Sequence, residues 1–371
     1  MKTPPPISVF LTRRKFVRQL TAGAAALTFS LRSRAQPAPR RLGLALVGLG
    51  NYATGSLAPA FPLTQHCQVA GVVTGSPEKG RQWARAFGFP ATSIYGYDTM
   101  ARMADNPAID IVYVVTPNAL HAGHVIAAAQ AGKHVISEKP FTTTVAEAEA
   151  AMAACRAAQV KLSIGYRLHF DPYHGELRRL AREQDYGAFT RIAGGFSFIM
   201  RNKVWRAEKK LAGGGPLMDL GIYFIQSACM AANGAAPIAV TAQEGPKTRP
   251  DLFADVEETM NWTMEFASGL AGEGSTSYQK NLNQVRADAP KGYIAIRDAY
   301  SYDGQTGGTT KGELYFAVPV NQQALQMDDF ALCVREGRES RVAGEMGLRD
   351  MKIIEAIYAA AKSGQRTEVR A

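Results

Sequence analysis

The sequence predicts an α/β protein: a doubly wound parallel-sheet domain, then an α+β domain with an open, mostly antiparallel sheet. Three observations support this prediction. Apolar runs alternate with helical segments up to about residue 165, a glycine-rich turn follows the first run, and short strand-like segments succeed one another after residue 190. A chain of 371 residues is long enough for two domains. We expect these domains at residues 36–165 and 166–371, after a leader at residues 1–35.

The leader has the pattern of an export signal. Arg13 and Arg14 are followed by Phe16, an apolar segment runs through residues 20–31, and Ser33-Arg34-Ala35 offers a small-x-small cleavage site. The apolar segment is too short to span a membrane, so we expect no stable membrane anchor. The paired arginines predict twin-arginine export of the folded protein to the periplasm, with a mature start near Gln36.

Charge and composition exclude some functions. Residues 1–35 hold seven basic side chains and no acidic one, which leaves a formal net charge of +3 on the rest of the chain. That is not the charge pattern of a nucleic-acid binder. The four cysteines are widely spaced and demand no disulfide. His121 and His124 have no third ligand nearby in sequence, so no metal site is predicted.

A dinucleotide-binding turn follows the first predicted strand. Residues 42–48 read LGLALVG, and residues 48–53 continue as GLGNYA, a GxGxxA pattern between a strand and a helix. Its glycines permit a tight turn and a close approach of a pyrophosphate to the helix N-terminus.

The second strand, at residues 68–73, indicates which dinucleotide binds. NAD sites usually carry an acidic residue at the end of this strand, where it binds the ribose 2′-hydroxyl. Thr74 stands there instead, and Lys79 follows five residues later. Hydroxyl and ammonium groups favour a 2′-phosphate, so NADP is preferred over NAD, although Lys79 could equally be a surface residue.

Further strands also end in polar residues at the predicted carboxyl edge of the sheet, where ligands bind in doubly wound folds. The strand at 109–115 leads into Thr116-Pro-Asn118, and the strand at 133–137 leads into Glu138-Lys139-Pro140. Pro140 leaves the preceding peptide bond free to be cis or trans.

Residues 211–223, LAGGGPLMDLGIY, hold the candidate acid/base groups. Asp219 and Tyr223 are four residues apart, which on a helix places them on one face. A carboxylate and a phenol together suit proton transfer with a hydroxyl group. The alternative is a helix N-terminus with Asp219 in solvent and Tyr223 in the core.

The second half contains a predicted helix at 172–183 and strands at 190–198, 239–243, 259–266, 269–276 and 293–297. Helices at 326–336 and 344–363 complete the predicted α+β domain.

The motifs GLGNYA, TPNALH, SEKP, GYRLHFDP and VWRAEKKLAGGGPLMDLGIY resemble the glucose–fructose oxidoreductase/inositol dehydrogenase (Gfo/Idh/MocA) family. The resemblance runs from about residue 42 to the C-terminus. It implies that Lys139 lies beside the nicotinamide, Tyr223 is the general acid/base and Asp219 positions a sugar hydroxyl. Thr74 and Lys79 would hold the 2′-phosphate. The other cofactor-binding residues it implies are Gly48, Leu49, Gly50, Asn51, Tyr52, Tyr97, Thr116, Asn118, His121, Glu138, Arg167, Trp205, Arg206 and Tyr302.

The leader, Thr74 with Lys79, and Tyr223 in place of the histidine of most members resemble the periplasmic glucose–fructose and aldose–aldose oxidoreductases. That subgroup implies oxidation of an aldose to its lactone and hydride transfer through tightly bound NADP to a second sugar. It also implies a homo-oligomer, dimer or tetramer, formed through the C-terminal sheet. Pocket loops around Phe170, Met200 and Asn202 would determine which sugars serve as donor and acceptor.

Two alternatives remain. The predicted N-terminal arm, from Gln36 to Leu42, is shorter than the arm with which relatives clamp NADP. This favours an ordinary sugar or polyol dehydrogenase with exchangeable cofactor. A non-catalytic sugar-binding protein on the same scaffold would not need Lys139, Asp219 and Tyr223 together.

Overall fold

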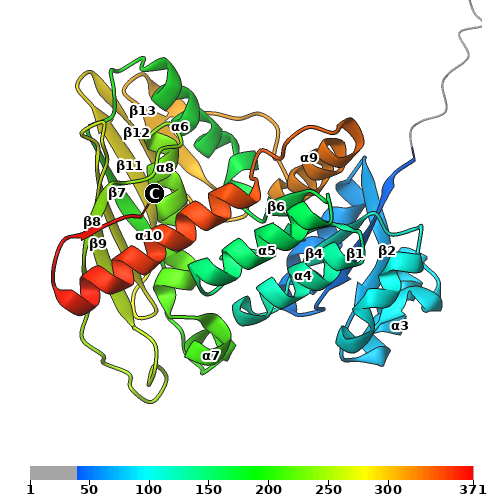
Figure 1. Cartoon of the computed structure of the whole chain (residues 1–371). Coiled ribbons are helices and arrows are strands. Elements are labelled where there is room, and N and C mark those ends of the chain that lie inside the picture. The colour runs from blue at the N-terminus through cyan, green and yellow to red at the C-terminus, as the bar shows by residue number, and fades with distance from the viewer. Residues whose placement is uncertain (1–39, 371) are drawn as a thin grey trace, which may run out of the picture. The chain divides into compact units, whose positions relative to one another are not determined.

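A six-stranded parallel sheet organises the first half of the computed structural model, which describes residues 40–370 (Figure 1). The predicted leader and cleavage site lie outside the described residues. The strand order is β3-β2-β1-β4-β5-β6, the doubly wound arrangement predicted from the sequence. The central strands are buried on both faces, which explains their continuous apolar runs. The strands are β1 (Leu42–Val47), β2 (Cys67–Val73), β3 (Ile94–Tyr95), β4 (Ile111–Val114), β5 (His134–Ser137) and β6 (Leu162–Ile164).

Helices cover both faces of this sheet. Alternate side chains of β1 enter two separate apolar cores: Val47 packs in one with α4 and α5, and Leu46 in the other with α3. The helices of this half are α2 (Ala58–Ala60), α3 (Pro77–Phe87), α4 (His121–Gln130) and α5 (Val145–Ala157). Thr144 and Glu147 form a capping box at the start of α5, which satisfies amides of its first turn.

Helix α9 (Gln322–Glu336), which belongs to the second half of the sequence, packs on the first sheet. Met327 and Phe330 lie in the same core as Leu46 and Trp83. Asp328 accepts hydrogen bonds from the backbone amides of Gln65 and His66, at 2.8 Å each. The chain therefore returns to the first sheet after building the second.

A nine-stranded sheet organises the second half. Its order is β14-β13-β12-β11-β7-β10-β9-β8-β15, and every neighbouring pair is antiparallel except β7 and β10. The strands are β7 (Arg191–Ser197), β8 (Ala239–Glu244), β9 (Thr259–Glu265), β10 (Ala271–Ser277), β11 (Leu282–Ala289), β12 (Gly292–Arg297), β13 (Thr306–Thr309), β14 (Gly312–Leu314) and β15 (Thr367–Glu368).

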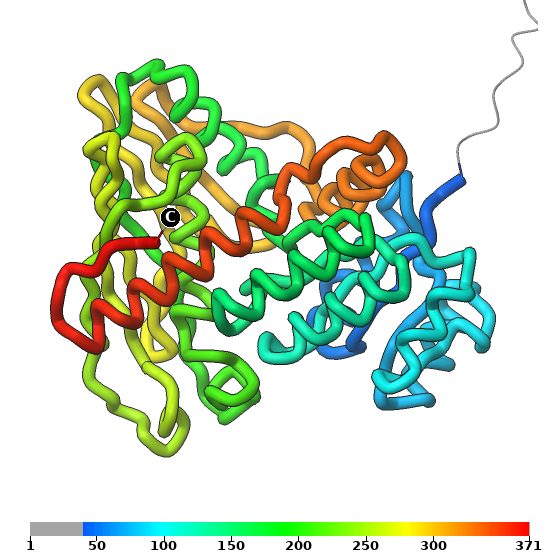
Figure 2. Tube along the Cα trace, viewed as in Figure 1, coloured from blue at the N-terminus to red at the C-terminus, as the bar shows by residue number. Residues whose placement is uncertain are grey.

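Helices lie on one face of this second sheet, as Figure 1 shows. Strand β9 alternates buried Met260, Trp262 and Met264 with exposed Asn261 and Thr263, so its other face is polar. The helices of this half are α6 (Pro172–Glu183), α7 (Lys209–Ala212), α8 (Ile222–Ala231) and α10 (Gly344–Ser363). Helix α10 contacts both α5 and β8, and Figure 2 shows it running from one sheet toward the other.

The structure confirms the predicted fold class and most predicted elements. Helices α6 and α10 have the predicted bounds, whereas α9 begins at Gln322, four residues earlier than predicted, because Asn321 caps it. The sequence interpretation missed β11, β13 and β14, whose residues are mostly polar or glycine. Within residues 40–370, we find no helix with the length and apolar character needed to cross a bilayer.

Candidate active site

A cavity of about 980 Å³ lies at the carboxyl edge of the first sheet, and α8 and the strand β7 close it on the other side. Every catalytic and cofactor-binding residue predicted from the sequence lines this cavity, Tyr302 included. Met200 and Asn202 also line it, whereas Phe170 does not. The structure therefore brings the predicted residues together, and their individual roles stay predictions.

The glycine-rich turn fits a dinucleotide. Gly48 adopts a φ of +98°, a conformation that other residues rarely accept. A side chain at Gly50 would point into open space, so this backbone leaves room for a bulky group at the start of the following helix. That helix opens with a π-helical turn at Ala53–Leu57. The tight turn at Gly48 and the open space at Gly50 both suit a pyrophosphate.

The loop after β2 lines the cavity with hydroxyl and ammonium groups. Thr74 is buried at the end of β2, and its hydroxyl accepts a hydrogen bond from the Ser76 amide at 3.1 Å. Lys79 is exposed in the first turn of α3, and its amide donates to the Ser76 hydroxyl at 3.4 Å. The carboxylates in the cavity lining are those of Glu138 and Asp219, and neither lies on this loop.

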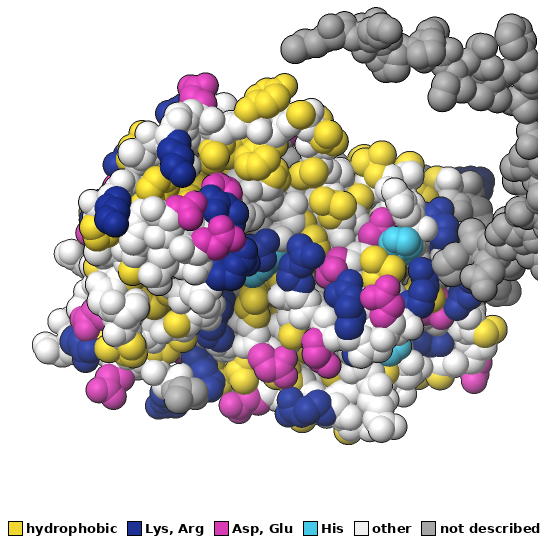
Figure 3. Space-filling view, turned by 90° about the horizontal axis from the view of Figure 1, so that it is seen from above, with side chains coloured by type: hydrophobic (Ala, Val, Ile, Leu, Met, Phe, Trp, Pro, Cys, Tyr) yellow, Lys and Arg dark blue, Asp and Glu magenta, His cyan; other side chains and the backbone are white. Residues whose placement is uncertain are grey.

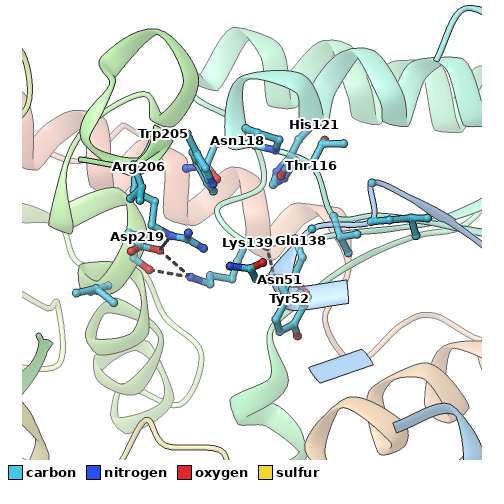
Figure 4. A pocket seen from close by; sticks show the side chains of 18 of the residues that line it. Asn51, Tyr52, Thr116, Asn118, His121, Glu138, Lys139, Trp205, Arg206 and Asp219 are labelled. Carbon is cyan, nitrogen blue, oxygen red and sulfur yellow. Dashed lines mark hydrogen bonds and ion pairs between the residues drawn. The ribbon is translucent and has the colours of Figure 1, made fainter. Parts of the chain in front are cut away.

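Lys139, Asp219 and Tyr223 converge from two parts of the chain. The Lys139 Nζ donates to the Asp219 backbone carbonyl at 2.7 Å and lies 3.7 Å from its carboxylate, as the dashed line in Figure 4 marks. The same ammonium lies 4.5 Å from the centre of the Tyr223 ring. The Lys139–Pro140 peptide bond is cis. The candidate proton-transfer groups thus share one cation.

Asp219 is held in its charged form by its neighbours. Burial raises the pKa of this carboxyl, but Arg206 and then Lys139 outweigh burial, so the pKa lies below its usual value. Arg206 Nε donates to Oδ1 at 3.2 Å, and the Tyr278 hydroxyl donates to Oδ2 at 3.1 Å. Asp219 is therefore a fixed hydrogen-bond acceptor facing the cavity, not a solvated surface residue.

Tyr223 lies between two cations. Burial raises the pKa of its phenol, but Arg167 and Lys139 together bring the pKa below the usual value of a tyrosine. The Arg167 guanidinium lies 4.9 Å from the Tyr223 ring centre and 4.4 Å from that of Tyr302. Arg167 donates to Gln322 and to the backbone carbonyls of Tyr300 and Ser301, which fixes it in place. Tyr223 is consequently suited to lose and regain a proton.

The three glycines before Asp219 pack against other parts of the protein and do not line the cavity. A side chain at Gly214 would meet the Tyr358 hydroxyl at 2.0 Å, and one at Gly215 would meet the Glu257 carbonyl at 2.2 Å. The buried Glu257 carboxylate accepts from the Gly215 and Leu217 amides, at 2.8 and 3.0 Å, and from Tyr358 at 2.9 Å. Asp219 then lies in a π-helical turn, Leu217–Gly221, that leads into α8.

Two of the predicted residues, His121 and Glu138, are placed to hold the loop that carries Lys139. Both ring nitrogens of His121 lie within hydrogen-bond distance of a backbone carbonyl. Nδ1 is 2.9 Å from the carbonyl of Pro140, and Nε2 is 2.8 Å from that of Thr116. Glu138 accepts from the Tyr113 hydroxyl at 2.6 Å, and burial raises the pKa of its carboxyl. Through these bonds both residues connect the loop that carries Lys139 to β4 and the segment after it.

Sequence reasoning missed some residues that shape the site. Tyr278, which holds Asp219, follows β10 without any motif, so no local signal marks it. Ser76 could have been found as the N-cap of α3, because Pro77 follows it. Phe196, Phe198 and Ile199 also line the cavity from β7 and the segment after it. Among residues 40–370, no three His, Cys, Asp or Glu side chains gather as a metal site would need, and the four cysteines are free and buried.

Comparisons with known proteins agree with this geometry. Residues 42–166 match the model of an oxidoreductase family with an NAD-binding Rossmann fold (GFO/IDH/MocA), and residues 174–294 match the model of the GFO/IDH/MocA C-terminal domain. The crystal structure of an aldose-aldose oxidoreductase from Caulobacter crescentus, complexed with glycerol, is 40% identical with a TM-score of 0.86. The match covers 89% of this chain and 100% of that one.

Two further relatives have assigned activities. The D-xylose 1-dehydrogenase [NADP(+)] of Haloarcula marismortui is 27% identical over 86% of this chain and 91% of its own length. The scyllo-inositol 2-dehydrogenase (NAD(+)) of Bacillus subtilis is 28% identical over 80% of this chain and 86% of its own. With both family models and a 40% identical structure matched across the two sheets, the chain belongs to the GFO/IDH/MocA family of NAD(P)-dependent oxidoreductases.

Proposed function

We propose that this protein is a periplasmic, NADP-dependent sugar oxidoreductase that oxidises an aldose to its lactone and passes the hydride to a second sugar. The observation that carries the proposal is the cluster of Lys139, Asp219 and Tyr223 at one end of a cavity whose other end fits a dinucleotide. The 40% identity to an aldose-aldose oxidoreductase over 89% of this chain supports it.

The side chains suit each proton movement of this reaction. NADP, when bound, supplies the hydride acceptor and, once reduced, the hydride donor. Tyr223, its charged form stabilised by Arg167 and Lys139, takes the proton of the C1 hydroxyl while C1 loses a hydride, which gives the lactone. Asp219 accepts a hydrogen bond from a sugar hydroxyl and so orients C1. In the second half-reaction Tyr223 returns its proton to the carbonyl oxygen of the acceptor sugar, whose carbon receives the hydride, giving an alditol.

NADP is proposed over NAD because of the loop after β2. Thr74 and Ser76 present hydroxyl groups there, Lys79 adds a positive charge, and no carboxylate of the cavity lining lies on this loop. The Haloarcula relative is named for NADP(+) and the Bacillus relative for NAD(+), so the family uses both. We expect NADP to bind more tightly than NAD in a direct titration.

The proposed export fits a closed cycle, since an enzyme that keeps its cofactor bound needs no free NADP outside the cytoplasm. Replacing the predicted signal pair, Arg13→Lys with Arg14→Lys, should retain the protein in the cytoplasm. If the double variant is exported as well as the wild type, the twin-arginine proposal fails. We also propose a homo-oligomer that forms through the helix-free face of the second sheet.

One observation favours a second candidate, an ordinary sugar dehydrogenase with exchangeable cofactor. Tyr97 and Tyr302 line the cavity and yet are 43% and 48% exposed, so the cavity is open to solvent at these residues. Such an open cavity would let a bound dinucleotide leave.

The deciding experiment is an absorbance and fluorescence spectrum of the natively exported protein after extensive dialysis. A retained nicotinamide that becomes reduced on adding glucose and reoxidised on adding a second sugar would establish the closed cycle. Tyr223→Phe is the matched control, because it keeps the ring but removes the proton acceptor, and it should retain cofactor without reduction. Protein that loses its cofactor and works only with added NADP or NAD would instead be the ordinary dehydrogenase.

A further inference from the structure

A second cavity, of about 330 Å³, lies in the second half of the molecule between α6, α8 and α10. Its wall includes Arg178, Arg179, Arg182 and Arg349, and no acidic side chain lines it. The space-filling view from above shows Lys and Arg side chains gathered around a hollow, with part of a histidine visible beside them (Figure 3). The proposed reaction uses none of these residues.

Three of the four arginines are neutralised by carboxylates outside the cavity. Arg179 pairs with Glu176 at 2.8 Å, Arg182 with Glu183 at 2.9 Å, and Arg349 with Asp350 at 2.7 Å; these acids do not line the cavity. Their guanidinium groups therefore supply donors and polar walls but little net charge.

Arg178 differs from the other three. Within residues 40–370 it has no ion pair; it donates to the backbone carbonyl of His169 at 2.9 Å and to the His169 ring Nδ1 at 3.3 Å. Burial lowers the pKa of its guanidinium, and Arg341 and Arg182 lower it further, with no acid to offset them. A half-buried cation without a counter-ion is costly unless a ligand supplies the charge.

His169, beneath Arg178, adds no charge to the cavity. Burial lowers the His169 pKa to about 3, so the ring is neutral. Its Nδ1 accepts from Arg178, and its Nε2 donates to the Gln226 side chain at 2.9 Å. Gln226 in turn donates to Asp350, which pairs with Arg349. This buried chain fixes Arg178 and leaves a single uncompensated positive charge at the wall.

We propose that this cavity binds a small oxyanion, the carboxylate or phosphate of a soluble metabolite, with Arg178 as its counter-ion and Arg182 as a second donor. The guanidinium fork suits the planar or tetrahedral oxygens of such groups. The volume admits a molecule of sugar-acid or sugar-phosphate size. The site shares its elements with the active site, because α8 carries both Tyr223 and Gln226 and the 3₁₀ turn Arg167–Phe170 carries both Arg167 and His169.

The test is calorimetric titration of the full-length protein, saturated with NADP so that the first cavity cannot bind the probe at its phosphate positions. The probes are succinate, inorganic phosphate and methyl phosphate, none of them a sugar that the first cavity would take as substrate, with succinamide as the uncharged comparison. Binding of succinate alone identifies a carboxylate site, and binding of the two phosphates identifies a phosphate site. Either supports the proposal if Arg178→Gln weakens it by about tenfold or more.

Two variants make the test decisive. Arg182→Gln removes a more exposed donor from the same wall, so it should fold normally and weaken binding several-fold even if Arg178→Gln proves unstable. Arg102→Gln, an exposed arginine outside both cavities, should leave binding unchanged. The proposal is overturned if no anion binds at millimolar concentration, if succinamide binds equally well, or if Arg178→Gln and Arg182→Gln both bind as the wild type does.

Discussion

Single side chains set the acid/base behaviour of the site, and the ammonium group of Lys139 influences both Asp219 and Tyr223. Its ammonium lies 3.7 Å from the Asp219 carboxylate and 4.5 Å from the Tyr223 ring centre. Spacing predicted that Asp219 and Tyr223 share one helix face, and the family resemblance implied that Lys139 joins them. It could not predict the partners that tune them, since Arg167, Arg206 and Tyr278 arrive from separate parts of the fold.

Replacing Lys139 should change the pH dependence as well as the rate. Lys139→Met removes one of the two cations that lower the Tyr223 pKa, so that pKa rises. Sugar oxidation needs the deprotonated phenol, and its rate therefore increases as pH rises through this pKa. In the variant we expect kcat for oxidation to fall about a hundredfold or more, and the rising limb of the pH profile to move to higher pH.

The measurement is the initial rate of nicotinamide reduction by an aldose across the pH range, with Lys362→Met, an exposed lysine on α10, as control. The control profile should coincide with that of the wild type. A Lys139→Met profile that falls in amplitude without moving would show that Lys139 does not tune Tyr223.

At the scale of elements, the glycine loop before α8 determines where Asp219 lies. These glycines pack on Tyr358 and Glu257, which follow them by some 140 and 40 positions in the chain, so no local pattern identifies these partners. The same limit explains strand β11: its residues, LNQVRADA, alternate between a buried and a polar face, and only pairing with β7 and β12 makes the strand evident.

Gly214→Ala should disturb both stability and turnover. Its Cβ would lie 2.0 Å from the Tyr358 hydroxyl, which Glu257 holds in place, so the loop must shift and carry Asp219 with it. We expect the free energy of unfolding to fall by about 1–3 kcal/mol and kcat/KM to fall by about a hundredfold. Urea unfolding and steady-state kinetics measure the two effects.

Two comparisons separate this clash from a general effect of alanine. Gly123→Ala lies at an exposed position of α4, where the new Cβ meets nothing within 4 Å, and it should leave both quantities nearly unchanged or raise stability slightly. Adding Tyr358→Phe to Gly214→Ala should recover part of the lost activity. Equal behaviour of the two glycine variants would contradict the packing argument.

At the scale of the whole molecule, α9 makes the two sheets depend on each other. The sequence placed this helix in the second domain because it follows the second set of strands, yet its apolar face completes the core of the first sheet. Local pattern identifies a helix and its buried face, but not which of two sheets that face covers. Gln322, in the first turn of α9, also accepts from Arg167 at the active site. The first sheet, the cofactor cavity and the second sheet are thus connected through one helix.

This connection predicts that the described chain unfolds as one unit. Phe330, 1% exposed, packs in the core with Trp83, so Phe330→Ala should lower the free energy of unfolding by about 3–5 kcal/mol. Leu325→Ala, on the same helix but 42% exposed, should cost far less. Because loss of the first sheet removes the support of Arg167 and the packing of α9 together, scanning calorimetry of Phe330→Ala should show a single transition at lower temperature. Two transitions, of which only one moves, would mean that the second sheet is stable without the first and that α9 is a tether, not a shared part of both folding units.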